Sequence, residues 1–330
     1  MVGSPDDPVR NYHFLSLLRG HGIEVQHLDQ DISLEGQRFE KGKAYTVPLR
    51  QAQSQLVEAL FQKTTQFEDS LFYDISAWTL PLAFHLPYAQ TRQIPAGAPI
   101  DRPEFPAGSL HEEAETVAYT LDWGHYYAPR ALYRLLAHNL KVKVATEKAV
   151  YPAGKEVVTV AQGALVVPVA DQPQSPEELR GLMQALAREN GLDVYALSSG
   201  LAGEGIDLGS EQWSVLRQPK IALVVGQGVQ SYEAGEVWHV LDQRYQVPLT
   251  LLDIERFRQS DLSRYNTLVL VSGNYSELSS EINRLLGLAS PGQYAGSYWL
   301  GKQLAANYRG SKYEYKNASP ARFIAPPALC

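Results

Sequence analysis

Hydrophobic and polar positions along the chain follow the pattern of helices that lead into short strands. The clearest sign is a phrase that occurs three times, in which an apolar helical run is followed by a polar corner and a short β-like run. The three copies are Leu17–Val25, Leu135–Val142 and Leu186–Val194. Apolar spacing that changes from a helical period to a period of two is typical of a helix followed by a strand. The repeat therefore predicts an α/β protein built from similar units.

The segments that precede the first two copies differ. Residues 115–123, before the second copy, have the pattern of a good strand, whereas residues 1–10, before the first copy, contain two prolines and two aspartates. Proline and aspartate are depleted in strands. We therefore expect the first lobe to lack its leading strand, as though the chain began partway through a structure.

The third part of the chain has the clearest alternation of strands and helices. Ile221–Val225 is a continuous apolar run, which indicates a strand buried on both faces. Helical and strand patterns alternate after it, up to a helix at 277–286, and this order favours a parallel, doubly wound sheet. The chain as a whole is predicted to be α/β, with two or three Rossmann-like or flavodoxin-like lobes and mostly parallel sheets.

These patterns also predict domain boundaries. Residues 93–110 contain four prolines and few strong helix or strand formers, so they are the best linker candidate. The predicted parts are a first α/β lobe at 1–92, this linker, a second α/β lobe at 111–210 and a last lobe at 217–330 that becomes irregular after about residue 287.

Composition excludes several classes of function. The chain has 330 residues, a formal net charge of −7 and a single cysteine, Cys330. This charge gives no reason to expect nucleic acid as a partner, and one cysteine cannot form a disulfide or a thiolate metal cluster within the chain. No apolar run approaches the roughly 20 residues that span a bilayer. Residues 1–10 do not resemble a signal peptide, so an exported parent protein would carry its signal upstream.

Two glycines follow the buried strand of the last lobe. Gly226 and Gly228 lie between that strand and a helix, where a phosphate-binding loop would lie. The full dinucleotide fingerprint needs a third glycine, and Gln230 and Ser231 stand there instead. A tight turn at the end of a strand explains the same residues, and both interpretations stay open.

The helix predicted at 235–245 carries the densest set of functional candidates. Glu236, His239 and Gln243 share one face of it, opposite an apolar face. The beginning of such a helix faces the ligand crevice of an open α/β sheet, so these side chains could bind a small ligand or act in acid–base chemistry. A solvated helix face is the alternative. Asp74, at the end of a strand predicted at 71–75, and Trp78, which follows that strand, could line a pocket. A helix-capping role for Asp74 or Ser76 explains this stretch equally well.

No self-contained catalytic site is predicted. His239 and Asp242 have an H-x-x-D spacing, but no histidine follows them to supply a third zinc ligand. Ser272 lies at a strand-to-helix turn without the leading glycine of a nucleophile elbow. We therefore predict no catalytic residue, no metal site and no cofactor in this chain.

Two sets of ordered phrases carry a resemblance to a known family. The first set is Phe14–Val25, Phe39–Gly42, Val47–Leu49 and Ser70–Pro81, and the second is Ala222–Gly228, Tyr232, Gly235–His239 and Leu241–Arg244. Together they resemble the region that follows the peptidase domain in large bacterial zinc carboxypeptidase-like proteins of the carboxypeptidase A type. The last part of that region is similar to class I glutamine amidotransferase-like domains, usually without the catalytic cysteine.

This resemblance implies a function without implying a catalytic residue. In such proteins zinc and the catalytic glutamate belong to the upstream peptidase domain, and the parent protein is exported to the periplasm or the outside of the cell. The chain would then be an accessory region that positions peptide or cell-wall-derived substrate or packs against the peptidase domain. The alternatives are a small-ligand-binding module that uses the crevice from Gly226 to His239 and a cryptic hydrolase that uses Glu236 and His239.

Overall fold

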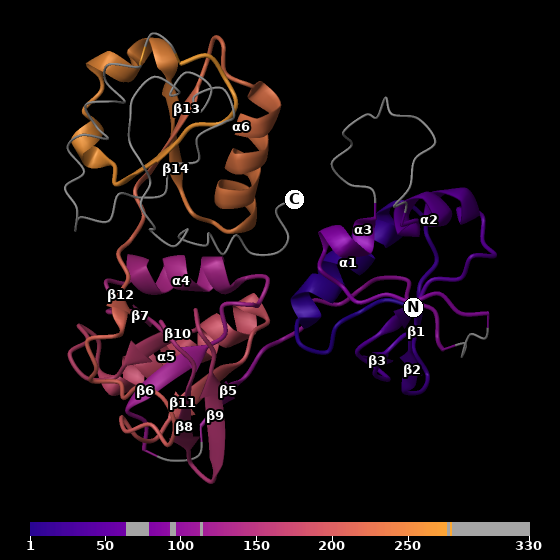
Figure 1. Ribbon diagram of the computed structural model, residues 1–330, viewed down its shortest axis with the longest axis horizontal. Helices are drawn as coiled ribbons and strands as arrows, with labels where there is room; N and C mark the ends of the chain where they lie inside the picture. The colour runs from indigo at the N-terminus through magenta and orange to yellow at the C-terminus, as the bar shows by residue number, and fades with distance from the viewer. Residues whose placement is uncertain (64–78, 93–96, 113–114, 276–277, 279–330) are drawn as a thin grey trace, which may run out of the picture. The chain divides into compact units, whose positions relative to one another are not determined.

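A computed structural model describes residues 1–63, 79–92, 97–112, 115–275 and 278 (Figure 1). Contacts divide these residues into two compact units. The first unit contains Met1–Ala131 and Lys141–Val215, and the second contains Leu132–Leu140 and the described residues from Leu216 onward. Within the described residues, no helix combines the length and the apolar character that crossing a membrane requires.

The first lobe is small and has a core of its own. Its elements are α1 (Pro8–Gly20), β1 (Gln26–His27), β2 (Ile32–Leu34), β3 (Gln37–Phe39), β4 (Tyr45–Thr46), α2 (Ser54–Phe61) and α3 (Leu80–Ala83). β1 pairs with β4 and β2 pairs with β3, both in antiparallel register. Val2 forms bridges to Tyr45 and to Tyr88, so residues before α1 contribute to the sheet. That the first lobe lacks a leading strand stays a prediction.

The threefold repeat corresponds to three copies of one helix stop. In each copy the corner residue has a left-handed backbone, with φ of 72° at Gly22, 59° at Asn139 and 60° at Gly191. The next residue is buried and donates its N–H to a carbonyl five residues earlier, as in Ile23 to Leu18 (3.0 Å). This is the Schellman arrangement, which satisfies the last helical carbonyls. The repeat therefore predicts three helix ends correctly. The three copies are alike because each helix has to satisfy its last carbonyl groups.

The second lobe is built around a six-stranded sheet. Its strands lie in the order β12-β7-β10-β6-β11-β5. The elements are β5 (Leu110–His111), β6 (Ala118–Leu121), α4 (Ala128–Ala137), β7 (Lys143–Val144), β8 (Ala149–Ala153), β9 (Glu156–Val160), β10 (Leu165–Pro168), α5 (Pro176–Asn190), β11 (Val194–Leu197) and β12 (Ser214–Val215).

Two β-α-β units interlock in this sheet. β10 lies between β6 and β7 and is antiparallel to both, while β6 lies between β10 and β11 and is antiparallel to both. Each of the units β6-α4-β7 and β10-α5-β11 therefore has a strand of the other inserted, which is the split β-α-β arrangement. The α/β class is as predicted, but only β11 and β5 are a parallel pair here. The inserted strands make this sheet mixed and not mostly parallel.

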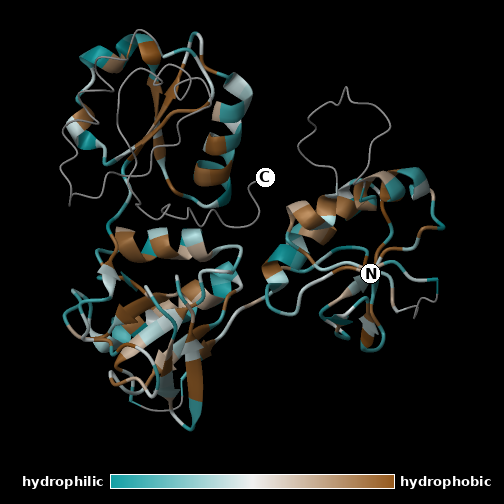
Figure 2. Cartoon of the chain, in the orientation of Figure 1, coloured by the Kyte–Doolittle hydropathy of each residue, from teal (hydrophilic) through white to brown (hydrophobic). Residues whose placement is uncertain are grey.

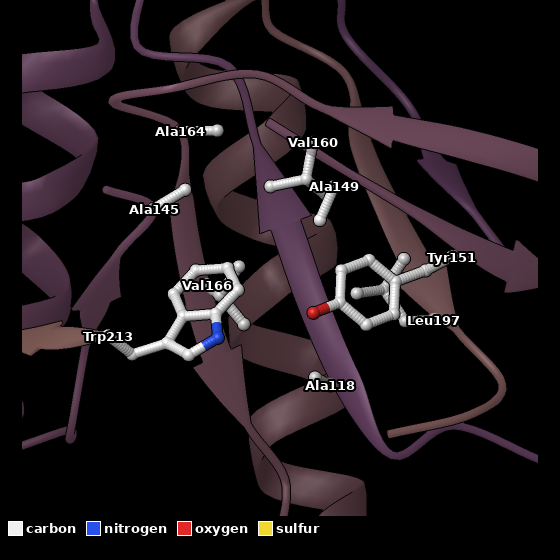
Figure 3. Close-up of a cluster of buried hydrophobic side chains, with 9 residues drawn as sticks. All are labelled: Ala118, Ala145, Ala149, Tyr151, Val160, Ala164, Val166, Leu197 and Trp213. Carbon is white, nitrogen blue, oxygen red and sulfur yellow. The ribbon is translucent and has the colours of Figure 1, made fainter. Parts of the chain in front are cut away.

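One face of this sheet is covered by segments that connect its strands, namely the β8–β9 hairpin and the segment before β12. Tyr151 of the β8–β9 hairpin and Trp213 of the segment before β12 pack over Ala118, Val166 and Leu197 of the central strands. Figure 3 shows these side chains on one side of the sheet, with a helix crossing behind the strands. The Tyr151 hydroxyl donates to the carbonyl of Ile206, so its polar end is satisfied.

The second unit contains a three-stranded sheet that is parallel throughout. Its strands are β13 (Ile221–Val225), β14 (Leu249–Asp253) and β15 (Thr267–Val269), in the order β14-β13-β15. The helical elements are α6 (Ser231–Trp238), η1 (His239–Arg244, a π-helix), η2 (Ile254–Gln259) and η3 (Leu262–Arg264). Separate hydrophobic clusters lie on its two faces, around Leu223 and around Phe257. These strands are strongly apolar (Figure 2), as predicted.

Part of the predicted linker is bonded to the lobes that it connects. Residues 98 and 100 exchange backbone hydrogen bonds with His27 and Val25. Gly108 lies so close to Leu192 that an added Cβ would be 2.0 Å from its carbonyl oxygen. The described residues of this segment are therefore held along the first unit and do not form a free tether.

Candidate functional site

The end of the parallel sheet is the place where an α/β protein of this topology binds ligands. β14 lies on one side of β13 and β15 on the other, so the chain reverses its direction of travel across the sheet at β13. In the flavodoxin-like order the crevice lies between the loops that follow the first and third strands. Here these are the loop after β13, which contains Gly226 and Gly228, and the loop after β15.

These two loops are hydrogen-bonded to each other. The N–H of Gln230 donates to the carbonyl of Ser272 (2.8 Å), and the N–H of Asn274 donates to the carbonyl of Gly228 (2.9 Å). Val229 and Gly273 form an antiparallel bridge between them. Backbone groups that could have contacted a ligand at this edge therefore bond to the opposite loop.

A carboxylate of the protein completes the closure. Oε2 of Glu233, in the first turn of α6, accepts the N–H of Ser272 (2.8 Å). The Tyr275 hydroxyl donates to the carbonyl of Val271 (2.9 Å). Burial, together with the nearby Glu233 carboxylate, raises the pKa of Tyr275 to about 12. A carboxylate in the first turn of α6 is thus bonded to the loop that follows β15.

The two candidate glycines are required by backbone geometry. Gly226 has a φ of 112° and Gly228 a φ of 85°. A Cβ at Gly226 would lie 3.2 Å from Ile254 and 3.3 Å from Asp253. A side chain is excluded there both by conformation and by space, so the tight-turn interpretation accounts for these residues.

Glu236, His239 and Gln243 lie on the exposed face that the sequence predicts. They do not join the glycine loop in one site. Gly228 lies before the start of α6, while His239 follows its last residue, and eight residues of helix extend about 12 Å at about 1.5 Å per residue. Gln243 donates to the neighbouring Asp242 (2.5 Å). The candidates Asp74 and Trp78 lie outside the described residues.

A second candidate site lies in the first lobe. A cavity of about 990 Å³ is lined by residues of β4, of the segment that follows β4, of α2 and of 88–92. The lining residues that bear on its chemistry are Thr46, Arg50, Val57, Phe61, Tyr88 and Arg92. Thr46 is only 2% exposed, and its hydroxyl oxygen has no hydrogen-bond partner. The Thr46 hydroxyl is thus enclosed in the protein beside this cavity.

Sequence reasoning missed two polar pairs. Asp7 caps α1 through the N–H of Arg10, forms an ion pair with its guanidinium (3.2 Å) and accepts the N–H of Tyr126 (2.7 Å). The segment Asp7-Pro8, a capping residue followed by proline, could have identified this helix start. The second pair, His111 and Asp193 (3.2 Å), joins β5 to β11, and no spacing in the sequence signals it. Both pairs hold neighbouring segments together.

Among the described residues, no three histidine, cysteine, aspartate or glutamate side chains gather as a metal site would require. No protein-family model matches the chain, and neither a search of curated proteins nor a search of solved structures finds a match.

Proposed function

We propose that this chain is an accessory, non-catalytic region of a zinc carboxypeptidase-like hydrolase, where it positions peptide or cell-wall-derived substrate or packs against the peptidase domain. Zinc and the catalytic glutamate belong to the upstream domain in this proposal. The ordered phrases of the sequence, from Phe14 in the first lobe to Arg244 in the last, support this parentage.

One observation about the last lobe carries the non-catalytic part of the proposal. The loops after β13 and β15 bond to each other, and Glu233 takes the N–H of Ser272. An α/β enzyme keeps polar groups at this edge available for substrate, because they must stabilise charge in the transition state. Here they stabilise the lobe itself, which suits a scaffold better than a cryptic hydrolase.

The test is a peptidase assay of the purified chain with and without added zinc. We expect no hydrolysis of carboxypeptidase substrates under either condition. Turnover that a chelator abolishes would contradict the proposal. The parentage is tested separately by the genomic sequence upstream of the codon for Met1, where we expect an open frame that encodes an H-x-x-E motif and a later histidine.

A small-ligand-binding module at Gly226–His239 is the second candidate, and the exposed face of Glu236 and His239 is the observation in its favour. If that face binds a ligand, Glu236→Ala and His239→Ala should weaken binding and leave the melting temperature unchanged. A lower melting temperature without a change in binding would make both residues structural.

A further inference from the structure

The β8–β9 hairpin of the second lobe has one free edge. β8 has a partner on each side, because it pairs with β9 (Figure 1) and its Val150 forms an antiparallel bridge with Glu204. Among the described residues, β9 pairs only with β8. The backbone groups on the outer side of an edge strand can bind another strand. The outer side of β9 is therefore a candidate interaction surface.

The hydrogen bonds of β8 show which groups of β9 face this edge. Val150 donates its N–H to Glu204 (2.8 Å) and accepts the N–H of Gly203 (2.8 Å), so its backbone groups point away from β9. Val150 lies opposite Thr159, and two opposite residues of an antiparallel pair either bond to each other or both point away. The N–H and C=O groups of Thr159 therefore face the free edge, as do those of Val157, two positions earlier. In the part of the chain that the structure describes, these groups have no hydrogen-bond partner.

The sequence of β9 leaves this edge unprotected. Residues 157–160 are Val-Val-Thr-Val, and all four are branched at Cβ, which suits an extended strand. Val157 is 71% exposed, whereas Val160 is buried in the core beneath the hairpin. Proteins usually protect an edge with proline, lysine or a bulge. β9 contains neither residue, its pairing with β8 runs without a bulge, and the nearest lysine, Lys155, lies in the turn before it.

We propose that two copies of this chain pair through β9, in antiparallel orientation about a two-fold axis at Val158. Val157 of one copy then lies opposite Thr159 of the other. These are the residues whose backbone groups face the edge, so each such pair exchanges both of its N–H···O=C bonds. The two hairpins become one continuous antiparallel sheet.

The side chains favour a second copy as the partner. In this register the exposed side chain of Val157 packs against the methyl group of Thr159 across the junction, and such pairs of β-branched residues stabilise a sheet. Glu156, the one charged residue of β9, lies opposite Val160 of the other copy, so like charges do not meet. The contact is small beside the 20–30 residues a side of a standard interface, and we therefore expect a dissociation constant on the order of 100 μM.

The first experiment is sedimentation equilibrium of the full chain over a concentration series up to about 1 mM, which spans this dissociation constant. We expect the average mass to rise with concentration from that of one chain toward that of two. A mass that stays at one chain throughout would overturn the proposal.

Two variants test whether the contact lies at β9. Val157→Lys adds a charge to the edge, and Thr159→Pro removes an N–H that faces it, so each should weaken association at least about tenfold. Neither change removes a hydrogen bond within the hairpin. Val215→Lys is the matched control, because Val215 is also exposed (61%) but lies in β12, at another edge strand of the lobe. It should leave association unchanged, and equal weakening by the control would contradict a β9 interface. Melting temperatures identify a variant that fails to fold.

Introduced cysteines test the register, in a chain that also carries Cys330→Ser. When Val157→Cys and Thr159→Cys are combined, the new residues lie opposite each other across the junction with Cα atoms about 5.5 Å apart, which a disulfide can bridge. Either substitution alone leaves the equivalent positions of the two copies roughly 8 Å apart, which is too far. Mild oxidation should therefore link the double variant into a covalent dimer and leave both single variants unlinked. Equal linking of all three would overturn the register. The peptidase assay tests the accessory role separately, because this inference does not depend on it.

Discussion

The edge of the parallel sheet and the cavity of the first lobe are both places where a ligand could bind. They differ in whether their polar groups have hydrogen-bond partners within the protein. At the sheet edge, Gln230 donates its N–H to Ser272 and Asn274 donates its N–H to Gly228. The N–H of Ser272 in turn donates to Glu233. Beside the cavity, the Thr46 hydroxyl is buried and has no hydrogen-bond partner among the described residues. Proteins normally pair their buried polar groups, so the two regions differ in how completely their polar groups are satisfied.

The largest effect that distinguishes the two regions should come from alkaline pH. We call the edge of the parallel sheet where the loops after β13 and β15 bond to each other the closed edge. Burial raises the pKa of Tyr275, which lies there, to about 12 from an ordinary value of about 10. The folded state therefore holds this proton more tightly than the unfolded state. Its contribution is fully present below about pH 10 and is lost as the pH rises to about 12, a change on the order of 3 kcal/mol.

Urea denaturation at a series of pH values measures this effect. Tyr275→Phe should flatten the pH dependence of the unit that contains the parallel sheet. Tyr151→Phe is a matched control, because burial also raises the pKa of Tyr151 to about 12 but in the other unit. An unchanged pH dependence in Tyr275→Phe would show that this hydroxyl does not stabilise the closed edge.

Substitution of Gly226 should destabilise the closed edge by about 2 kcal/mol, because a Cβ there adds backbone strain and crowds Asp253 and Ile254. Gly226→Ala is compared with Gly235→Ala, which lies inside α6 with open space around it. The control should be neutral or stabilise the protein by up to about 1 kcal/mol. Thermal unfolding measures both, and equal melting temperatures would contradict the structural role of Gly226.

Loss of the Glu233 carboxylate should cost about 1–2 kcal/mol, because the N–H of Ser272 loses its acceptor. Glu236→Ala, on the exposed face of the same helix, should change stability by less than about 0.5 kcal/mol. Chemical denaturation of Glu233→Ala and Glu236→Ala tests the difference. If both variants have the same stability, the bond from Glu233 does not hold the two loops together.

The smallest change, with the opposite sign, is expected in the cavity. Thr46→Val removes an unpaired buried hydroxyl and keeps the shape, so stability should stay the same or rise by up to about 1 kcal/mol. Thr120→Val is the matched control, because the buried Thr120 hydroxyl donates to the carbonyl of Leu165 (3.0 Å) and its loss should be destabilising. A clear loss of stability in Thr46→Val would mean that this hydroxyl already has a partner.

Local signals predicted local structure well. The apolar run Ile221–Val225 predicted a buried parallel strand, and the corner residues Gly22, Asn139 and Gly191 marked three helix ends. Strand neighbours in the second lobe could not be predicted, because β-α-β patterns do not say whether another strand inserts between their ends. The parallel sheet that the pattern predicts is found in the last lobe, whereas the sheet of the second lobe is mixed.

The cavity was beyond sequence reasoning for a related reason. Thr46, Arg50 and Arg92 come from segments up to about 46 positions apart, and none belongs to a known motif. Their common feature is a side chain whose polar atoms have no partner among the described residues, and only the packing of the fold reveals this. The glycine loop, by contrast, was visible because its residues are adjacent, and local geometry turned out to explain them.

The interlocked units of the second lobe have a consequence for folding. Neither β6-α4-β7 nor β10-α5-β11 contains two neighbouring strands, so neither can form a hydrogen-bonded ladder by itself. During synthesis β6 can pair with a neighbouring strand only after β10 has been made, more than 40 residues later. Such non-local pairing slows folding. Two fragments cut in the hairpin between β8 and β9 should each lack the six-stranded sheet when alone and regain it when mixed.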